Sequence, residues 1–246
     1  MALLGAATIT ASLHAAAVSV QAPARPASPE QQALTALDRV KPPIQFAVYV
    51  ARAGDDLQVA IEEPADAVAA GRWKNGADLT ALAEGADGQD VGFAEGTLSP
   101  SGHALLRLPI EPGAAVRRVA VRLHAPDEVL IETAPVAERT TLVGDPLVYR
   151  AGRHATADPI AILSFSRHDA IRVEWPILAP LSGCGVRLLD AAGRPTPKRL
   201  TLDRTDPRVL RLRWKVPRLE PGDYLVEMTA TGGAVHERTL LAIRAR

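Results

Sequence analysis

Hydrophobic and polar residues alternate along the chain from Ile44 onward, in short runs that turn residues separate. The runs IQFAVYVA (44–51) and DLQVAIE (56–62) are joined at Gly54, so the pattern predicts two strands that pair in a hairpin. Runs of this kind continue to the end of the printed sequence. The alternation therefore predicts an all-β protein.

The same order of turns and strands occurs twice. Tight-turn signals at Gly88 and at Gly193 are each followed by an alternating strand, a Glu-Pro-Gly corner that ends at Gly113 or Gly222, and another strand. Two units of about 100 residues with short strands match the size and rhythm of immunoglobulin domains. We predict two tandem immunoglobulin-like antiparallel β-sandwich domains.

We place these domains at residues 44–140 and 141–246, with the boundary near Thr140–Asp145, where an alternating strand ends and a proline follows. Residues 1–43 precede them as a leader or linker. Within it, SPEQQALTALDRV (28–40) has hydrophobic residues at helical spacing, which predicts a short helix or a flexible connector.

Residues 1–22 have two possible interpretations. Small apolar residues lead to Val20-Gln21-Ala22, which could serve as the cleavage site of a secretory signal. No Lys or Arg precedes the apolar stretch, however, and polar residues interrupt it. The alternative is a linker or the incomplete start of a longer chain.

Four residues of the second unit have predicted structural roles. Pro221 and Gly222 turn the chain, and Tyr224 follows at the position of a tyrosine corner, whose hydroxyl bonds the backbone a few residues upstream. Trp175 falls on the hydrophobic side of its strand, which predicts a core position. The first unit has Ala115 near the place of Tyr224, so its corner needs another support.

Charge and hydropathy argue against two classes of partner. The chain has 28 basic and 28 acidic residues, which gives no reason to expect binding to nucleic acid or to an anionic membrane surface. No run of about 18 uninterrupted apolar residues occurs, so no membrane insertion is expected. The single Cys184 cannot form an intrachain disulfide.

No motif in the chain indicates catalysis. A nucleophile elbow, a phosphate-binding glycine loop and a zinc-protease helix are absent, and the six histidines are dispersed. We therefore predict a protein that is not an enzyme, without a cofactor or metal site. Acidic turn residues such as Asp203 and Asp206 would cap backbone groups or, alternatively, bind calcium. Trp73, beside the Asn75-Gly76 turn, is the candidate for an exposed ring that contacts a ligand.

Several segments resemble the C-terminal β-rich region of bacterial von Willebrand factor A-related (VWFA-related) proteins. The segments are GDPLVYRAG (144–152), FSRHDAIRVEWPIL (165–178), VRLLDAAGRP (186–195) and the stretch from Leu219 to Arg244. The resemblance implies a secreted, periplasmic or envelope-associated protein, and attachment to an upstream A-type domain. The metal motif of that domain, Asp-x-Ser-x-Ser, does not occur, so its cation-dependent binding is not implied for any residue of this chain.

The leading functional hypothesis is a non-enzymatic spacer and protein-interaction module of an exported or envelope-associated bacterial protein. Its protein partner is unknown, and sheet edges and interstrand loops would be its contact surfaces. The alternative is a ligand-binding accessory module, for carbohydrate, in which Trp73 stacks on the ligand.

Overall fold

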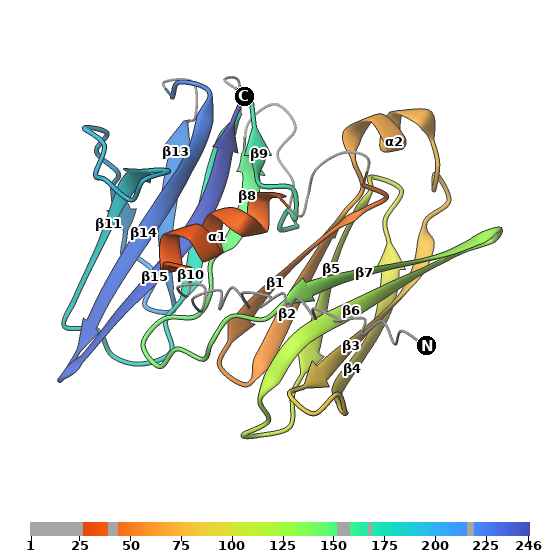
Figure 1. Ribbon diagram of the computed structural model, residues 1–246, viewed down its shortest axis with the longest axis horizontal. Coiled ribbons are helices and arrows are strands. Elements are labelled where there is room, and N and C mark those ends of the chain that lie inside the picture. Colours follow the sequence, from red (N-terminus) through yellow and green to blue (C-terminus); the bar gives the residue numbers. More distant parts are fainter. Residues whose placement is uncertain (1–26, 39–43, 152–157, 167–168, 216–218) are drawn as a thin grey trace, which may run out of the picture.

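The computed structural model describes residues 27–38, 44–151, 158–166, 169–215 and 219–246. The predicted all-β fold is confirmed: two immunoglobulin-like sandwiches lie side by side, with two short helices (Figure 1). No helix within these ranges is long and apolar enough to cross a membrane. The candidate signal at residues 1–22 lies outside the described residues.

The first sandwich has seven strands in two sheets. One sheet has the order β1 (Ala47–Ala53), β2 (Asp56–Glu62), β5 (His103–Pro109), and the other β4 (Asp90–Leu98), β3 (Ala77–Gly85), β6 (Val116–Ala125), β7 (Glu128–Pro135). The short helix α2 (Ala65–Ala70) lies between β2 and β3 in the chain. The predicted hairpin at Gly54 is confirmed, since β1 and β2 pair antiparallel along their whole length.

The second sandwich has the strand order of a constant-type immunoglobulin domain. One sheet has the order β12 (Leu202–Asp203), β13 (Val209–Lys215), β10 (Ala170–Pro176), β8 (Leu147–Ala151), and the other β11 (Gly183–Asp190), β14 (Gly222–Gly232), β15 (Val235–Ala245), β9 (Ser164–Phe165). In the constant-type arrangement the first, second, fifth and fourth strands form one sheet, as β8, β10, β13 and β12 do here. Strands β11, β14 and β15 correspond to the third, sixth and seventh.

The two turns that look equivalent in the sequence lead to different strands. After Gly88, β4 pairs along most of β3 in a long hairpin. After Gly193, the chain forms only an isolated bridge between Leu189 and Pro195, and then crosses to the other sheet as β12. Pro195 and Pro197 have no N–H group to donate to a ladder, so the hairpin cannot extend.

Each sandwich buries its own hydrophobic cluster. The first cluster is drawn from residues 46–134, and the second from residues 142–245 together with Leu37 of the N-terminal helix. Trp175 is fully buried in the second cluster. Residues 136–146, between β7 and β8, connect the two sandwiches and contain the Thr140–Asp145 segment.

Tyr224 lies near the start of β14, where the chain turns into this strand. Its hydroxyl donates a hydrogen bond to the carbonyl of Glu220 at 3.0 Å, across Pro221 and Gly222. This is the geometry of a tyrosine corner, in which one side chain fixes the connection between the fifth and sixth strands. At the equivalent corner of the first sandwich, the N–H of Ala114 donates to the carbonyl of Glu111 at 3.0 Å.

The N-terminal helix α1 (Pro29–Asp38) packs on the second sandwich, although it precedes the first in the chain. Ser28 and Gln31 exchange hydrogen bonds in a capping box that begins the helix. Glu30 pairs with Arg238 at 2.7 Å and Asp38 with Arg244 at 3.1 Å, so the helix covers the outer face of β14 and β15 (Figure 1). The helix is therefore an integral part of the second sandwich.

Candidate functional site

The junction between the sandwiches is built around buried polar groups. The backbone N–H of Arg52, near the end of β1, donates to Oδ2 of Asp145 at 2.8 Å, and the N–H of Asp145 donates to the Arg52 carbonyl at 2.8 Å. Both side chains are buried. A Cβ on Gly144 would lie 2.7 Å from the Arg52 carbonyl oxygen, so the close approach requires glycine there.

Burial dominates the electrostatics of this contact. It raises the pKa of Asp145 to about 6, although the Arg52 N–H and guanidinium act in the opposite direction. Burial also lowers the pKa of Arg52, with a further contribution from Arg139. The junction therefore encloses a carboxyl group that takes up a proton more readily than in water.

A second carboxylate crosses the junction from the end of β2. Oε2 of Glu62 accepts hydrogen bonds from the N–H groups of Ala161 at 2.9 Å and Ile162 at 2.7 Å. Its Oε1 lies 3.7 Å from a guanidinium nitrogen of Arg150. Burial raises the pKa of Glu62 against these favourable contacts. Glu62 thus supplies acceptors for two backbone donors of the other sandwich.

The connecting segment itself is held by the last strand. The carboxylate of Glu237, on β15, accepts hydrogen bonds from the N–H groups of Thr141, Leu142 and Val143, and from the Thr141 hydroxyl. Burial opposes ionisation, but these donors outweigh it and lower the pKa of Glu237. On the other side, the buried hydroxyl of Tyr49 donates to the Pro146 carbonyl at 2.7 Å. The connection is therefore fixed to both sandwiches.

The sequence gives only a weak signal for the residues at the junction. Glu62 falls among the acidic residues that the pattern assigns to turns, and its backbone partners lie 99 and 100 residues away. The one local indication is that β2 ends in AIE, two apolar residues and a carboxylate that are all buried. A strand buried on both faces at one end indicates a contact beyond its own core.

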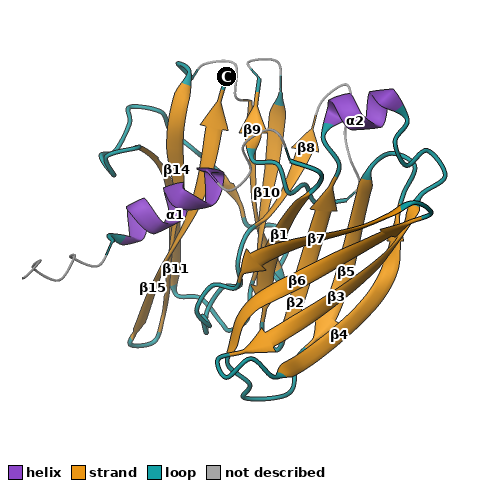
Figure 2. Ribbon diagram, turned by 45° about the vertical axis from the view of Figure 1, so that its right-hand side comes forward, coloured by secondary structure: helices purple, strands orange, loops and turns teal. Residues whose placement is uncertain are grey.

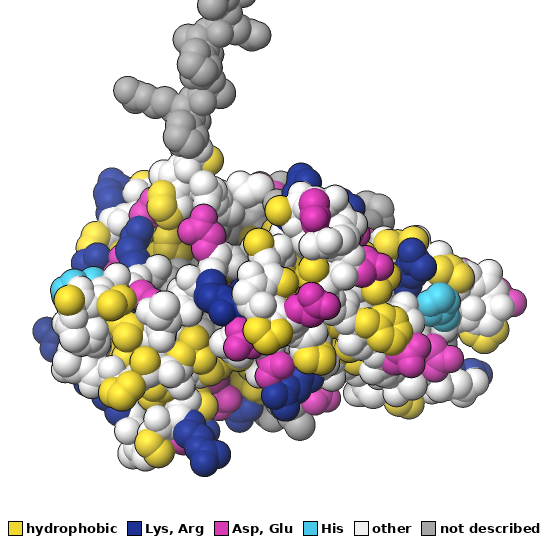
Figure 3. All heavy atoms as spheres, turned by 90° about the horizontal axis from the view of Figure 1, so that it is seen from below, with side chains coloured by type: hydrophobic (Ala, Val, Ile, Leu, Met, Phe, Trp, Pro, Cys, Tyr) yellow, Lys and Arg dark blue, Asp and Glu magenta, His cyan; other side chains and the backbone are white. Residues whose placement is uncertain are grey.

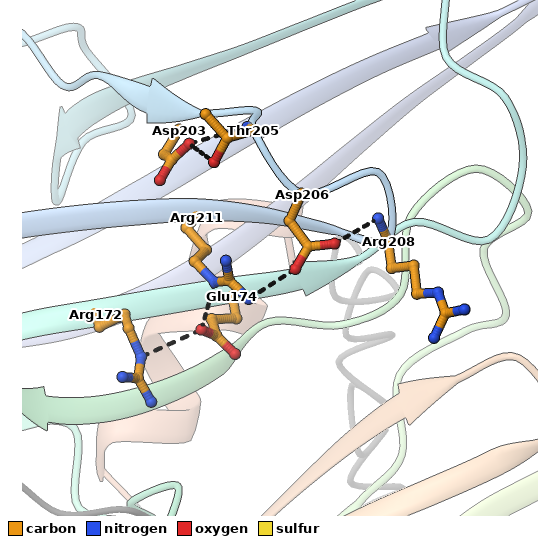
Figure 4. A network of polar contacts seen from close by, with 7 residues as sticks. All are labelled: Arg172, Glu174, Asp203, Thr205, Asp206, Arg208 and Arg211. Carbon is orange, nitrogen blue, oxygen red and sulfur yellow. Dashed lines mark hydrogen bonds and ion pairs between the residues drawn. The ribbon is translucent and has the colours of Figure 1, made fainter.

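A network of charged side chains covers the outer face of β10 and β13. The residues drawn in Figure 4 are Arg172, Glu174, Asp203, Thr205, Asp206, Arg208 and Arg211. Arg211 lies between two carboxylates, at 2.9 Å from Glu174 and 2.9 Å from Asp206, and Arg172 reaches Glu174 at 3.2 Å. The guanidinium of Arg172 also stacks on the ring of Tyr149, 4.0 Å from its centroid.

The acidic turn residues of this region have backbone partners. Asp203 accepts hydrogen bonds from the N–H and hydroxyl of Thr205, and Asp206 accepts from the N–H of Arg208 at 2.9 Å (Figure 4). The hydroxyl of Thr205 is the main cause of the lowered pKa of Asp203, and the Arg208 N–H of that of Asp206. Within the ranges that the structure describes, no group of three His, Cys, Asp or Glu residues could hold a metal ion.

Trp73 is buried, which corrects the expectation of an exposed ring there. Its side chain is only 5% exposed and belongs to the core of the first sandwich. The indole Nε1 donates to Oε1 of Glu128 at 3.3 Å, and Arg72 stacks on the ring at 4.6 Å while pairing with the same carboxylate. The turn after α2 folds the ring inward, because its large apolar area is better buried than hydrated.

The outer face of the β4-β3-β6-β7 sheet exposes large hydrophobic side chains. Phe93 on β4 is 52% exposed, and Val129 and Ile131 on β7 are each 58% exposed. Figure 2 shows this sheet at the front of the molecule, with β1, β2 and β5 behind it. Seen from below, hydrophobic side chains lie exposed among acidic and basic ones over both sandwiches (Figure 3).

No family model matches the chain, and no curated protein matches it. Among solved structures, Ig tandem domains of titin align over 82% of this chain and 99% of that chain, at 8% identity and a TM-score of 0.26. Titin domains in complex with telethonin align over 78% of this chain and 87% of theirs, at 12% identity and a TM-score of 0.24. We assign the immunoglobulin-like fold from the strand order within each sheet.

Proposed function

We propose that the chain is a non-enzymatic module that holds two immunoglobulin-like sandwiches in one fixed orientation, as a spacer and protein-interaction unit. The observation that carries this proposal is the set of hydrogen bonds at the junction, which we call the joint. The N–H of Arg52 in the first sandwich donates to the Asp145 carboxylate, and the Glu62 carboxylate accepts from the N–H of Ala161 in the second. The Glu237 carboxylate of the second sandwich accepts from the N–H of Leu142 in the connecting segment. Separating buried polar groups from their partners costs free energy, because each group is left without a hydrogen bond. Such a joint therefore favours a single arrangement of the two sandwiches.

The exposed sheet face of the first sandwich supports the interaction part of the proposal. Val129 and Ile131 lie together on β7, and Phe93 lies on β4 at the opposite edge of the same face. Charged side chains lie between them, and this mixture of apolar and charged groups is the character of non-obligate interfaces.

The setting is also part of the proposal. We place the chain in an exported or envelope-associated bacterial protein, on the strength of the resemblance to VWFA-related proteins between residues 140 and 246. Protease treatment of intact cells that express the full-length gene tests this. Digestion of the protein while a cytoplasmic marker survives supports export, and protection of the protein until lysis contradicts it.

Residual dipolar couplings test the fixed orientation directly. We expect amide couplings from both sandwiches to fit one alignment tensor in the unmodified chain, because the joint makes them one body. In the double variant Glu62→Ala/Glu237→Ala the two sandwiches should require different tensors, whereas the exposed control Asp127→Ala should behave like the unmodified chain. Two independent tensors in the unmodified chain would overturn the proposal.

A further inference from the structure

The two sandwiches differ in what covers the corresponding sheet. In the second, α1 lies over the outer face of β14 and β15, and Arg238 and Arg244 pair with its acidic residues. In the first, the equivalent strands β6 and β7 leave Val129 and Ile131 more than half exposed, and within the described ranges no helix packs on them. Figure 2 shows both situations in one view. The uncovered face therefore combines exposed hydrophobic side chains with charged ones.

Strand register fixes the layout of this face. Thr80 on β3 is paired with Glu95 on β4 and with Arg122 on β6, so these three side chains form one row across the sheet. Ile131 on β7 is the partner of Arg122 and ends the row. Glu95 and Arg122 are both exposed. An acidic and a basic side chain thus occupy opposite halves of the row.

One neighbouring row repeats this asymmetry, and the other has no charged side chain. In one, Asp78 on β3 is paired with His124 on β6, which is in turn paired with Val129 on β7. In the other, Phe93 on β4 is paired with Leu82 on β3. The half of the face formed by β4 and β3 is therefore acidic, and the half formed by β6 and β7 carries the basic and the β-branched side chains.

We propose that this face binds the same face of a second copy of the chain, about a two-fold axis that runs parallel to the strands between β3 and β6. This operation places β4 over β7 of the other copy and β3 over β6. Asp78 then faces His124 of the other copy, and Glu95 lies beside Arg122. Leu82 faces Ala120 of the other copy, and Phe93 faces Thr133. The arrangement of charges on one face is thus complementary to itself.

The size of the face sets the expected strength of the dimer. Four strands of eight to ten residues cover about 20 Å by about 28 Å, at about 4.8 Å between strands and about 3.4 Å per residue. The area buried by two such faces is about 1,100 Å², at the lower limit of specific interfaces, so we expect micromolar rather than nanomolar dissociation. The inference rests on the proposed function, since it names the partner of that interaction module.

Sedimentation velocity on the full chain and on two charge reversals tests the dimer. Glu95→Arg alone places two arginines at each contact, and Arg122→Glu alone places two glutamates, so each variant should dimerise at least 10-fold more weakly. An equimolar mixture of the two variants should recover dimerisation, because each contact then joins opposite charges. The exposed control Asp127→Ala should dimerise like the unmodified chain.

The outcomes separate this inference from the proposed function. Weakening by each reversal and recovery in the mixture support it, and recovery also shows that both variants are folded. A chain that stays monomeric at millimolar concentration overturns the inference, and so does a dimer that Glu95→Arg leaves unchanged. Either of these results leaves the fixed orientation of the two sandwiches to its own test by dipolar couplings.

Discussion

Arg52 and Asp145 form two hydrogen bonds across the junction: the N–H of Arg52 donates to Oδ2 of Asp145, and the N–H of Asp145 donates to the Arg52 carbonyl, each with an N to O distance of 2.8 Å. The two side chains carry opposite charges and are buried there together. A buried charge that loses its partner destabilises a protein more than the loss of the whole pair does. The junction is therefore more sensitive to single substitutions at these two residues than its contact area alone would indicate.

The raised pKa of Asp145 predicts a specific pH dependence of stability. Burial moves this pKa from the ordinary 3.8 to about 6, so between these values the folded chain keeps a proton that the unfolded chain releases. The contribution of Asp145 to stability therefore falls as pH rises through this window, and is constant above it. Asp145→Asn removes the titration and retains an oxygen acceptor for the Arg52 N–H.

We expect the stability of Asp145→Asn, relative to the unmodified chain, to rise by roughly 2–3 kcal/mol between pH 4 and pH 7, at about 1.4 kcal/mol per pKa unit. Urea unfolding of both proteins at several pH values measures this difference. Taking the difference cancels the other carboxylates, such as Glu237, whose lowered pKa acts with the opposite sign. A difference that does not change with pH would show that Asp145 is not a buried acid.

Removing the Glu62 carboxylate should weaken the joint in proportion to the acceptors lost. Glu62→Ala leaves the N–H groups of Ala161 and Ile162 without their acceptor, at about 1–3 kcal/mol for each donor that stays buried. Glu62→Gln keeps one oxygen in place and should lose less than half as much. Chemical unfolding measures both values, and equal losses for the two variants would contradict the assigned role.

Trp73→Ala should destabilise the first sandwich by about 3–5 kcal/mol, since removing a large buried ring leaves a cavity in the core. Trp175 and Trp214 lie in the other sandwich and report on it by fluorescence, and its transition should shift less than that of the first sandwich, since it loses only the contacts of the junction. Backbone amide exchange in β3 and β6 gives the matching measurement for the first sandwich. A variant with unchanged protection there would mean that Trp73 is not a core residue.

Two tyrosine hydroxyls offer a matched comparison of exposed and buried hydrogen bonds. The bond of Tyr224 to Glu220 lies near the surface, where water can replace it, so Tyr224→Phe should cost at most about 1 kcal/mol. The bond of Tyr49 to Pro146 is more buried, so Tyr49→Phe leaves a carbonyl unpaired and should cost about 1–3 kcal/mol. Denaturant midpoints measure both losses, and the reverse order would contradict the two environments.

Local patterns in the sequence predict much of the fold. Alternation identifies the strands, turn glycines identify hairpins such as that at Gly54, and the Pro-Gly corner before Tyr224 indicates its hydrogen bond to the backbone. Each of these features depends on residues within about ten positions of one another. The sheet switch after Gly193 also has a local cause, in Pro195 and Pro197.

The joint and the position of Trp73 could not be predicted in this way, because their causes are not local. Asp145 meets Arg52 across 93 positions, and nothing in the neighbourhood of either residue encodes the other. Trp73 stands between two basic residues beside a turn, a setting typical of exposed side chains. It is nevertheless part of the core of the first sandwich, and its indole N–H donates to Glu128, 55 positions away.

The contacts of α1 impose an order on folding during synthesis. This helix leaves the ribosome before either sandwich, yet Glu30 and Asp38 find their partners on β15, 208 and 206 positions later. The first sandwich can assemble as soon as β7 has emerged, since domains generally fold as units. The helix and the connecting segment wait for β15, so the strand that completes the second sandwich also fixes a helix that was translated before both sandwiches.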